Sequence, residues 1–477
     1  MRRLHVFGIL LFISCACIGV PVHAEVTHQV ITFGDLLPAG YAATADWDAL
    51  GIDGNERIYI GFTCSVSGLE DVALFRYDPS TGSRKFLGTF MQTAKTDANY
   101  QTGESIPKGH THMVMLNGKM YLGSQPFHDM KGEIYSTTNP ADNINNFRGS
   151  HLFSWDLNAE VLHDEARTSP SGVLTVHEGI IALGYSTYDS LLIGYSHPLG
   201  NLVLYNYLAN RVQKIAPGIP WTLGNPVSRE IIVTKKGKVY LYRGTEPPAD
   251  SAKAFNVYCY DIAGDALTKL NFQCRGGFWV GQAATVDRSA FYIMTIQGML
   301  YKLDAATDQW SALGYFLPSA DVAQGSRITY LYGMTISPDE KKLYAVVSVG
   351  ANAALSGNLY EFDIATRQTV LIKNVGAGCY CGTNLRDSRK NIYFARFGGS
   401  SDQWTGNCGL LIVNIKDRSG DPPTAAAFRR ASGTSATIPD MAGIRFTADG
   451  RRSRMPGPQP LSPRDIVAGQ PLFPARK

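Results

Sequence analysis

The chain has 477 residues, of which 44% are hydrophobic, so it is long enough to bury a large core. Its formal net charge is +4, and two of these charges, Arg2 and Arg3, lie in an N-terminal segment that we expect to be removed. The small remaining charge excludes an electrostatic argument for nucleic-acid binding. The 48 glycines, 24 tyrosines and few helical patterns favour an all-β protein.

The N-terminus has the pattern of a secretory signal peptide. An apolar run covers residues 6–20, and Val22-His23-Ala24 has the small residues typical of a cleavage site. We therefore expect residues 1–24 to be a signal peptide and the mature protein to be secreted or periplasmic. A lipoprotein attached through Cys15 or Cys17 is the alternative. No other segment reaches the ~18 apolar residues that span a bilayer, so we expect no membrane insertion.

One phrase, an apolar strand, a polar turn and a second apolar strand, occurs seven times. The copies are Leu50–Phe62, Met113–Gly123, Val173–Tyr185, Ile231–Arg243, Ala283–Thr295, Met334–Val347 and Asn384–Arg396. Each is followed by a strand that ends in Asp or Asn, namely at Asp78, Asp156, Asn206, Asp261, Asp304, Asp363 and Asn414. Their spacing is close to the ~40–50 residues of a propeller blade with its loops. The pattern predicts an all-β, seven-bladed β-propeller of four-stranded antiparallel blades over residues 25–416, with a two-domain β-sandwich as the alternative.

Both ends of the propeller must meet if its ring is to close. We expect His28–Phe33 to pair beside Leu410–Ile415 in one blade. The segment that follows, residues 417–477, is rich in Arg, Pro, Gly and Ser. This composition predicts a tail that is partly packed or loosely ordered.

The unusual polar residues of the chain fall in its long connections. In a propeller, the connections from second to third strand and from fourth strand to the next blade lie on one face, and long loops on a rigid scaffold commonly carry function. On this face we expect His110, His112, His128, His151, Tyr188, Tyr195, His197, Arg229 and Arg275. His110 and His112 contact substrate in this interpretation, and a Gly-His-Xaa-His metal chelate is the alternative.

Histidine, tyrosine and arginine without a dense carboxylate cluster suit one kind of chemistry. Two-carboxylate glycoside hydrolysis is disfavoured. In β-elimination from a uronic acid, Arg or protonated His neutralises the sugar carboxylate and so acidifies the C5 proton. A neutral His or a Tyr phenolate then removes that proton, and a Tyr or His protonates the leaving O4.

Three features of the sequence resemble a known family. They are a histidine in the insertion of the second blade, the strand start Gly149-Ser150-His151-Leu152, and the segment Gly-Tyr-Ser-His-Pro-Leu-Gly that contains Tyr195. These features are similar to the secreted seven-bladed β-propeller polysaccharide lyases, in particular the ulvan lyases, over most of residues 25–416. The resemblance implies a polysaccharide lyase that cleaves a uronate-containing polymer, with His128 and His151 as a catalytic pair and Tyr195 as the catalytic tyrosine.

The same resemblance implies an arginine shortly after the tyrosine, and Arg211 is the candidate at that distance. The predicted topology places Arg211 on the face opposite the predicted site. Arg275 lies on the same face as the site, so it is the better-placed partner for a carboxylate or sulfate. We assign substrate binding to the residues that remain around the pair, namely Arg275, Arg211, Arg229, His110, His112 and Tyr188. Catalysis is expected to need no cofactor.

The expected partner is an anionic polysaccharide, and the protein is expected to be a monomer. The alternative function is a non-catalytic propeller that binds glycans or proteins on the same face. Convergence of His128, His151 and Tyr195 on one sugar ring would favour the lyase. Divergence of these side chains would favour the binding protein.

Six cysteines remain after the expected loss of the signal peptide: Cys64, Cys259, Cys274, Cys379, Cys381 and Cys408. Cys379, Cys381 and Cys408 could hold a structural Zn²⁺. Disulfides are the alternative in an oxidising compartment, between Cys408 and either Cys379 or Cys381, and between Cys259 and Cys274.

Overall fold

The computed structural model describes residues 26–125, 148–220, 227–245, 253–317, 328–330, 332–349, 356–378, 380–396 and 408–420. The expected signal peptide, His128, Cys379 and the tail beyond Gly420 lie outside these ranges. Within them, no helix is both long and apolar enough to cross a bilayer.

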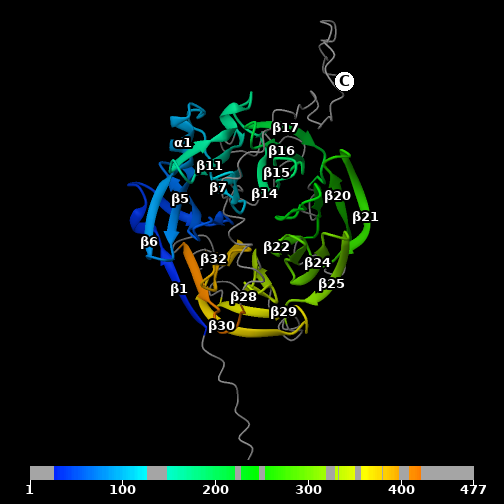
Figure 1. Cartoon of the computed structure of the whole chain (residues 1–477). Coiled ribbons are helices and arrows are strands. Elements are labelled where there is room, and N and C mark those ends of the chain that lie inside the picture. The colour runs from blue at the N-terminus through cyan, green and yellow to red at the C-terminus, as the bar shows by residue number, and fades with distance from the viewer. Residues whose placement is uncertain are drawn as a thin grey trace, which may run out of the picture. The chain divides into compact units, whose positions relative to one another are not determined.

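The strands of the described chain group into seven antiparallel blades arranged in a ring, so the fold is a seven-bladed β-propeller (Figure 1). A parallel pair of inner strands, Tyr332–Ile336 with Tyr380–Thr383, joins the last two blades into one nine-stranded sheet. From axis to rim, the first blade consists of β2 (Ala42–Ala45) and β3 (Leu50–Ile52), β4 (Ile58–Val66), β5 (Leu69–Asp78) and β6 (Ser83–Thr89). The second consists of β7 (Lys108–Gly109) and β8 (Val114–Leu116), β9 (Lys119–Gln125), β11 (Leu152–Asp156) and β12 (Val161–Asp164). The third consists of β14 (Gly179–Ser186), β15 (Leu191–His197), β16 (Leu202–Asn206) and β17 (Arg211–Ala216), and the fourth consists of β18 (Ile232–Val233), β19 (Lys238–Leu241), β20 (Phe255–Asp261) and β21 (Ala266–Cys274). The last three are β22 (Trp279–Ala284), β23 (Ala290–Thr295), β24 (Met299–Asp304), β25 (Gln309–Tyr315); β27 (Tyr332–Ile336), β28 (Lys342–Val349), β29 (Ser356–Asp363), β30 (Thr369–Ala377); and β31 (Tyr380–Thr383), β32 (Asn391–Arg396), β33 (Gly409–Asn414), β1 (Thr27–Thr32).

A few shorter elements complete the described fold. They are the two-stranded sheet of β10 (Gly149–Ser150) and β13 (Thr175–Val176), the strand β26 (Ile328–Tyr330) beside β28, the helix α1 (Phe90–Thr96), and the 3₁₀ turns η1 (Gly34–Leu36) and η3 (Glu165–Thr168). Thr89 is the N-cap residue directly before α1, and its side chain accepts a hydrogen bond from the Gln92 N–H.

The hydrophobic core consists of seven clusters, each lying between two neighbouring blades. One cluster joins the last blade to the first, and the other six join successive blades along the chain. Because each blade packs on both faces, its inner strands are apolar on both sides, as in β4, where every residue from Ile58 to Cys64 is buried. The ring of clusters is therefore closed.

The strand β1 closes the ring, as the sequence predicts. It pairs antiparallel with β33, from Thr27 opposite Asn414 to Thr32 opposite Gly409. The next residue, Phe33, is buried in the cluster between the last and the first blade. The N-terminal strand is thus the rim strand of the last blade.

The predicted Asp and Asn positions end the third strands of all seven blades. The reason is local, because each of these side chains accepts hydrogen bonds from backbone N–H groups of the turn that follows. Asp261 accepts from Ala263 and Gly264, and Asn206 accepts from Leu208 and Ala209. Such Asx turns stop the strand, and in the first six blades they start the hairpin to the rim.

The predicted hairpin Val173–Tyr185 of the third blade is wrong. The hairpin consists of β14 and β15, while Thr175 and Val176 belong to β13 and pair with β10. Residues of β15 are all buried, so this strand lacks the polar alternation that marks a half-exposed strand, and the sequence pattern assigned it to a loop. As a consequence, Tyr195 and His197 lie in a strand rather than an insertion.

Two predicted cysteine pairings do not fit the strand register. Cys259 is opposite Thr268 and Cys274 is opposite Phe255, so these two residues lie four positions apart along adjacent strands, or ~13 Å. Cys381 and the residue after Cys408 pair with β32 from opposite sides, which puts the two cysteines about two strand spacings apart, or ~10 Å. Both separations exceed the Cα distance of a disulfide.

Candidate functional site

A group of polar residues gathers where the innermost strands of the first, second and fourth blades begin, together with one residue of the third blade at the end of β15. We call it the axial cluster, and it consists of Trp47, Asp48, Lys108, His110, His112, His197, Arg229 and Glu230. Trp47 and Asp48 precede β3, the next three residues lie in or after β7, and Arg229 and Glu230 precede β18. These positions belong to the face on which the sequence predicts a site.

Contacts between blades hold the axial cluster together. The Lys108 ammonium lies 3.6 Å from the centre of the Trp47 ring, and the His110 ring stacks on the same indole at 5.9 Å. His112 Nδ1 lies 3.8 Å from Glu230 Oε2. The side chains of the first, second and fourth blades therefore meet near the axis.

The backbone at Asp48 is strained. Its φ is +137°, a conformation that non-glycine residues rarely adopt, and its N–H donates to Asp46 Oδ1 at 3.2 Å. Strained non-glycine residues persist only when their surroundings hold them, and they concentrate at functional sites. The Asp48 carboxyl lies close enough to Arg229 to feel its charge.

Burial controls the protonation of the cluster. It lowers the pKa of His112 to about 4, and burial together with Arg229 and Lys108 lowers the pKa of His197 to about 3. Burial and the neighbouring Asp48 raise the pKa of Glu230 well above its usual range. At neutral pH the two imidazoles are therefore unprotonated, while Glu230 holds its proton more tightly than an ordinary carboxyl group does.

The two basic side chains of the cluster, Lys108 and Arg229, differ in how firmly they hold a positive charge. Burial, reinforced by the charge of Arg229, lowers the pKa of Lys108 well below its usual value. Burial raises the pKa of Asp48 to about 8, and the attraction of Arg229 opposes this rise. A guanidinium cannot be deprotonated in proteins. Arg229 is thus the fixed positive charge of the axial cluster.

Several carboxyl oxygens of this region find no hydrogen-bond partner among the described residues. Both oxygens of Glu230, which is 1% exposed, belong to this group, as do Asp48 Oδ1 and Asp46 Oδ2. Buried polar atoms in native proteins are nearly always satisfied, and exceptions concentrate where a ligand or water binds. Glu230 is therefore poised for a ligand, although no three described residues form a metal-binding group.

His151 lies in a different place and is sealed from solvent. Its Nδ1 is 2.7 Å from Asp164 Oδ2 and its Nε2 is 3.0 Å from Glu104 Oε1. The ring also stacks on Phe153. Both nitrogens are occupied by buried carboxylates, so the structure assigns His151 a structural role, and its catalytic role stays a prediction without geometric support.

Tyr195 is also buried. Its hydroxyl donates a hydrogen bond to the carbonyl oxygen of Ile219 at 2.8 Å, and burial raises its pKa. The phenol is thus neither exposed nor inclined to ionise. His128, the third member of the predicted triangle, lies outside the described residues, so the convergence of all three is not tested.

The phenol of Tyr195 gives a prediction about stability. Replacing Tyr195 by phenylalanine is expected to lower the free energy of unfolding by about 1–2 kcal/mol, because the buried Ile219 carbonyl loses its donor. Denaturant unfolding followed by tryptophan fluorescence measures this change. Tyr188→Phe is the matched control and should change little, since Tyr188 is 63% exposed. Unchanged stability of Tyr195→Phe would contradict the structural role.

The remaining predicted residues lie in three places. His110, His112 and Arg229 belong to the axial cluster, as the prediction of substrate contact requires. Tyr188 lies in the turn between β14 and β15, and Arg211 begins β17, so both lie at the opposite ends of the strands. Arg275 follows β21 on the predicted face, where its side chain is exposed.

Sequence reasoning missed Asp48, Lys108 and Glu230, and it assigned no role at the site to His197. Asp48, His112 and Glu230 each stand two residues before an inner strand, namely β3, β8 and β18. This shared position is a signal that a blade-by-blade alignment of the repeat could have found. Two of the predicted zinc ligands, Cys381 and Cys408, lie on either side of β32. The third, Cys379, lies outside the described residues, so the zinc site stays a prediction.

Comparison with known proteins finds similarity only among solved structures. No known family profile matches the sequence, and no curated protein is detectably related to it. Among solved structures, a chain of the mitotic checkpoint complex aligns with a TM-score of 0.47 and 10% identity, covering 86% of this chain and 99% of its own. U3-55K aligns with a TM-score of 0.48 and 9% identity, covering 81% and 98%. The likeness to polysaccharide lyases thus stays a prediction from short motifs.

Proposed function

We propose that the protein is an exported β-propeller that binds a carboxylate-bearing glycan at the axial cluster. The observation that carries this proposal is the meeting of Arg229 with two unprotonated imidazoles and the carboxyl group of Glu230 at one end of the inner strands. A guanidinium binds a carboxylate through paired hydrogen bonds. Imidazole and a protonated carboxyl group exchange hydrogen bonds with sugar hydroxyls. Export is proposed from the signal-peptide pattern.

The charge balance around Arg229 supports an anionic ligand. Asp48 attracts Arg229, but burial raises the pKa of Asp48 to about 8, so much of it is protonated at neutral pH. A ligand carboxylate therefore meets the guanidinium with little opposing charge. Arg229 is half-buried, with its guanidinium 5.9 Å from the ring centre of Phe278, which limits the water that competes for it.

A second candidate function is cleavage of the bound glycan by β-elimination, without a cofactor. It is favoured by the pair of His112 and Glu230, since an unprotonated ring lies 3.8 Å from a carboxyl group whose pKa is raised by burial, and Arg229 directly precedes Glu230 in the chain. In this candidate, His112 removes the C5 proton, Glu230 protonates the leaving oxygen, and Arg229 holds the uronate carboxylate. A base with a pKa of about 4 accepts a proton less readily than one near neutrality, so binding is the first proposal.

Binding of ulvan and other uronate polymers, measured by calorimetry with a neutral polysaccharide as reference, tests the first proposal. Arg229→Gln is expected to raise the Kd by about 10–100-fold, because a charge-assisted hydrogen bond contributes ~1.5–3 kcal/mol. Arg211→Gln is the matched control, since Arg211 is exposed at the far end of the blade, and its Kd should not change. Equal effects of the two substitutions would contradict the axial site.

The same polymers separate binding from cleavage. The unsaturated product of β-elimination absorbs in the ultraviolet, so incubation with a bound polymer reports cleavage directly. If absorbance rises, His112→Gln is expected to slow the rise by about 10²–10⁴-fold while binding persists. Binding with constant absorbance would leave the non-catalytic propeller as the function.

A further inference from the structure

We propose that Cys64 and Cys408 form a reversible disulfide across the seam where the ring closes. Cys64 lies in β4 of the first blade, and Cys408 lies directly before β33 of the last blade. The bond would join two blades that are otherwise linked by packing, by the chain between β1 and β2, and by polar contacts such as the ion pair of Arg389 with Glu56. It is independent of the proposed glycan-binding function.

Three observations place the two thiols together. Both belong to the buried cluster between the last and the first blade. Cys64 pairs with Ala43 of β2, and Ala43 and Cys408 line the same cavity. The charge of Cys408 also contributes, after burial and Asp71, to the raised pKa of Cys64, which requires that the sulfurs be near each other.

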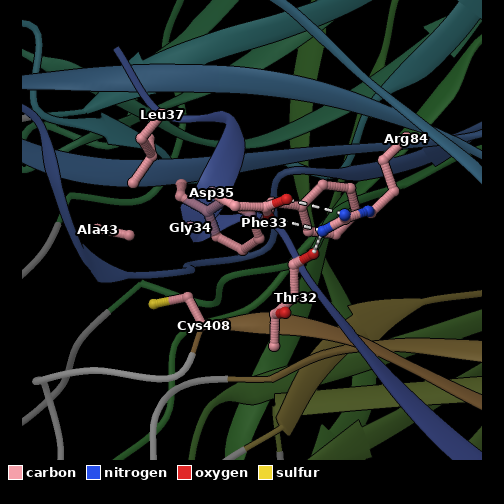
Figure 2. A pocket seen from close by; sticks show the side chains of 9 residues that line it. Thr32, Phe33, Gly34, Asp35, Leu37, Ala43, Arg84 and Cys408 are labelled. Atoms are coloured by element: carbon pink, nitrogen blue, oxygen red, sulfur yellow. Dashed lines mark hydrogen bonds and ion pairs between the residues drawn. The ribbon is translucent and has the colours of Figure 1, made fainter. Parts of the chain in front are cut away.

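The cavity beside Cys408 gives a reagent access to the seam. It has a volume of about 550 Å³ and is lined by Phe33, Phe62, Leu37 and the ion pair of Arg84 with Asp35. Figure 2 shows the Cys408 thiol on the same side of this cavity as Ala43. Cys64 is not among the lining residues and is fully buried, and its thiol donates to the Phe62 carbonyl oxygen at 3.5 Å. Cys408 is therefore the thiol that an oxidant meets first.

The chemistry is thiol–disulfide exchange with a small disulfide such as oxidised glutathione as the oxidant. The Cys408 thiolate attacks the reagent, forms a mixed disulfide and releases one thiol. The Cys64 thiolate then attacks the Cys408 sulfur, which forms the protein disulfide and releases the second thiol. Two cysteine thiols and one disulfide thus become one cystine and two small thiols. Burial raises the pKa of Cys64 to about 12, so we expect the second step to be slow.

No other pairing among the described cysteines has comparable support. Cys259 and Cys274 lie too far apart along their strands, and β32 separates Cys381 from Cys408. The Cys381 thiol instead points to the Asp46 carbonyl oxygen, 3.8 Å away. Cys64 and Cys408 are also roughly 340 residues apart in the sequence, and a cross-link over so long a loop restricts the unfolded chain strongly.

The test is oxidation of the purified full chain by oxidised glutathione, followed by non-reducing peptide mapping and thermal unfolding. A peptide that links Cys64 to Cys408 is expected, with a Tm about 3–6 °C above that of the reduced protein. Cys408→Ser should abolish both the linked peptide and the redox dependence of the Tm. Cys259→Ser is the control and should retain both, because Cys259 has no cysteine within reach in the described chain.

Three results would overturn the proposal. One is a cross-link of Cys408 to Cys379 or Cys381. Another is a Cys408 thiol that stays reduced or carries only glutathione after prolonged oxidation. The third is a zinc ion held by these cysteines, which metal analysis of the untreated protein would detect. The mapping of the wild-type chain decides among these results even if a serine variant fails to fold.

Discussion

Replacing Asp164 by alanine is expected to lower the free energy of unfolding by about 3–5 kcal/mol. Asp164 and His151 are both buried, and the imidazole Nδ1 lies 2.7 Å from Asp164 Oδ2. The same oxygen accepts a hydrogen bond from Asn99 at 2.7 Å. Removal of the carboxylate leaves the His151 Nδ1 and one N–H of the Asn99 amide without their acceptor, although Glu104 still contacts His151 and the Gly172 carbonyl oxygen still accepts from Asn99. The loss of two buried acceptor contacts exceeds that of a surface ion pair.

Denaturant unfolding of the full chain measures this effect, with Asp304→Ala as the control. Asp304 is an exposed carboxylate that only caps a turn, where it accepts hydrogen bonds from Ala306 and Thr307, so its loss should cost about 1 kcal/mol. If Asp164→Ala and Asp304→Ala destabilised the protein equally, the buried cluster around His151 would not be an important source of stability.

The pH dependence of the Asp164 effect has a definite sign. Burial lowers the pKa of His151, but hydrogen bonds to Asp164 and Glu104 outweigh burial and raise it above 6.5. A raised pKa in the folded state contributes stability below the unfolded pKa, and this contribution is lost as the pH rises through the folded pKa. The difference between wild type and Asp164→Asn should therefore be larger near pH ~6 than near pH ~9. An equal difference at both pH values would mean that His151 is neutral in the folded protein.

Much of the fold is predictable because its signals are local. An Asp or Asn side chain can accept a hydrogen bond from the backbone N–H two or three residues further along the chain, as Asp78 does from Ser80. Such a bond ends a strand without help from distant residues. Seven such positions gave the number of blades and the ends of the third strands. Closure by the N-terminal strand followed from the requirement that the ring of blades closes.

The third blade and the candidate site depend on distant packing, which the sequence does not display. All residues of β15 are buried between neighbouring strands and blades, so its pattern resembles any apolar segment. His151 and Tyr195 carry the motifs of a catalytic site, but nothing in a motif tells whether the side chain faces solvent. The carboxylates that enclose His151 come from positions 104 and 164, and the axial cluster draws on four blades.

Replacing Phe33 by alanine is the second change with a large expected effect, again about 3–5 kcal/mol in the free energy of unfolding. Phe33 is 1% exposed, and its ring lies 5.7 Å from Phe62 and 5.2 Å from Phe75. These contacts join the end of β1 to the first blade. The substitution opens a cavity in the cluster between the last and the first blade, where the ring closes.

The position of Phe33 predicts a local effect beside the global one. Backbone hydrogen exchange in β1, for example at Val30 opposite Leu411, should become faster in Phe33→Ala, because the seam opens more easily than the rest of the ring. Phe316→Ala is the control, since Phe316 is equally buried and stacks on Phe362 at 6.1 Å, away from the seam. It should cost similar stability and leave the exchange of β1 close to that of the whole protein. Similar exchange in the two variants would mean that the ring opens elsewhere and that β1 unfolds only with the entire propeller.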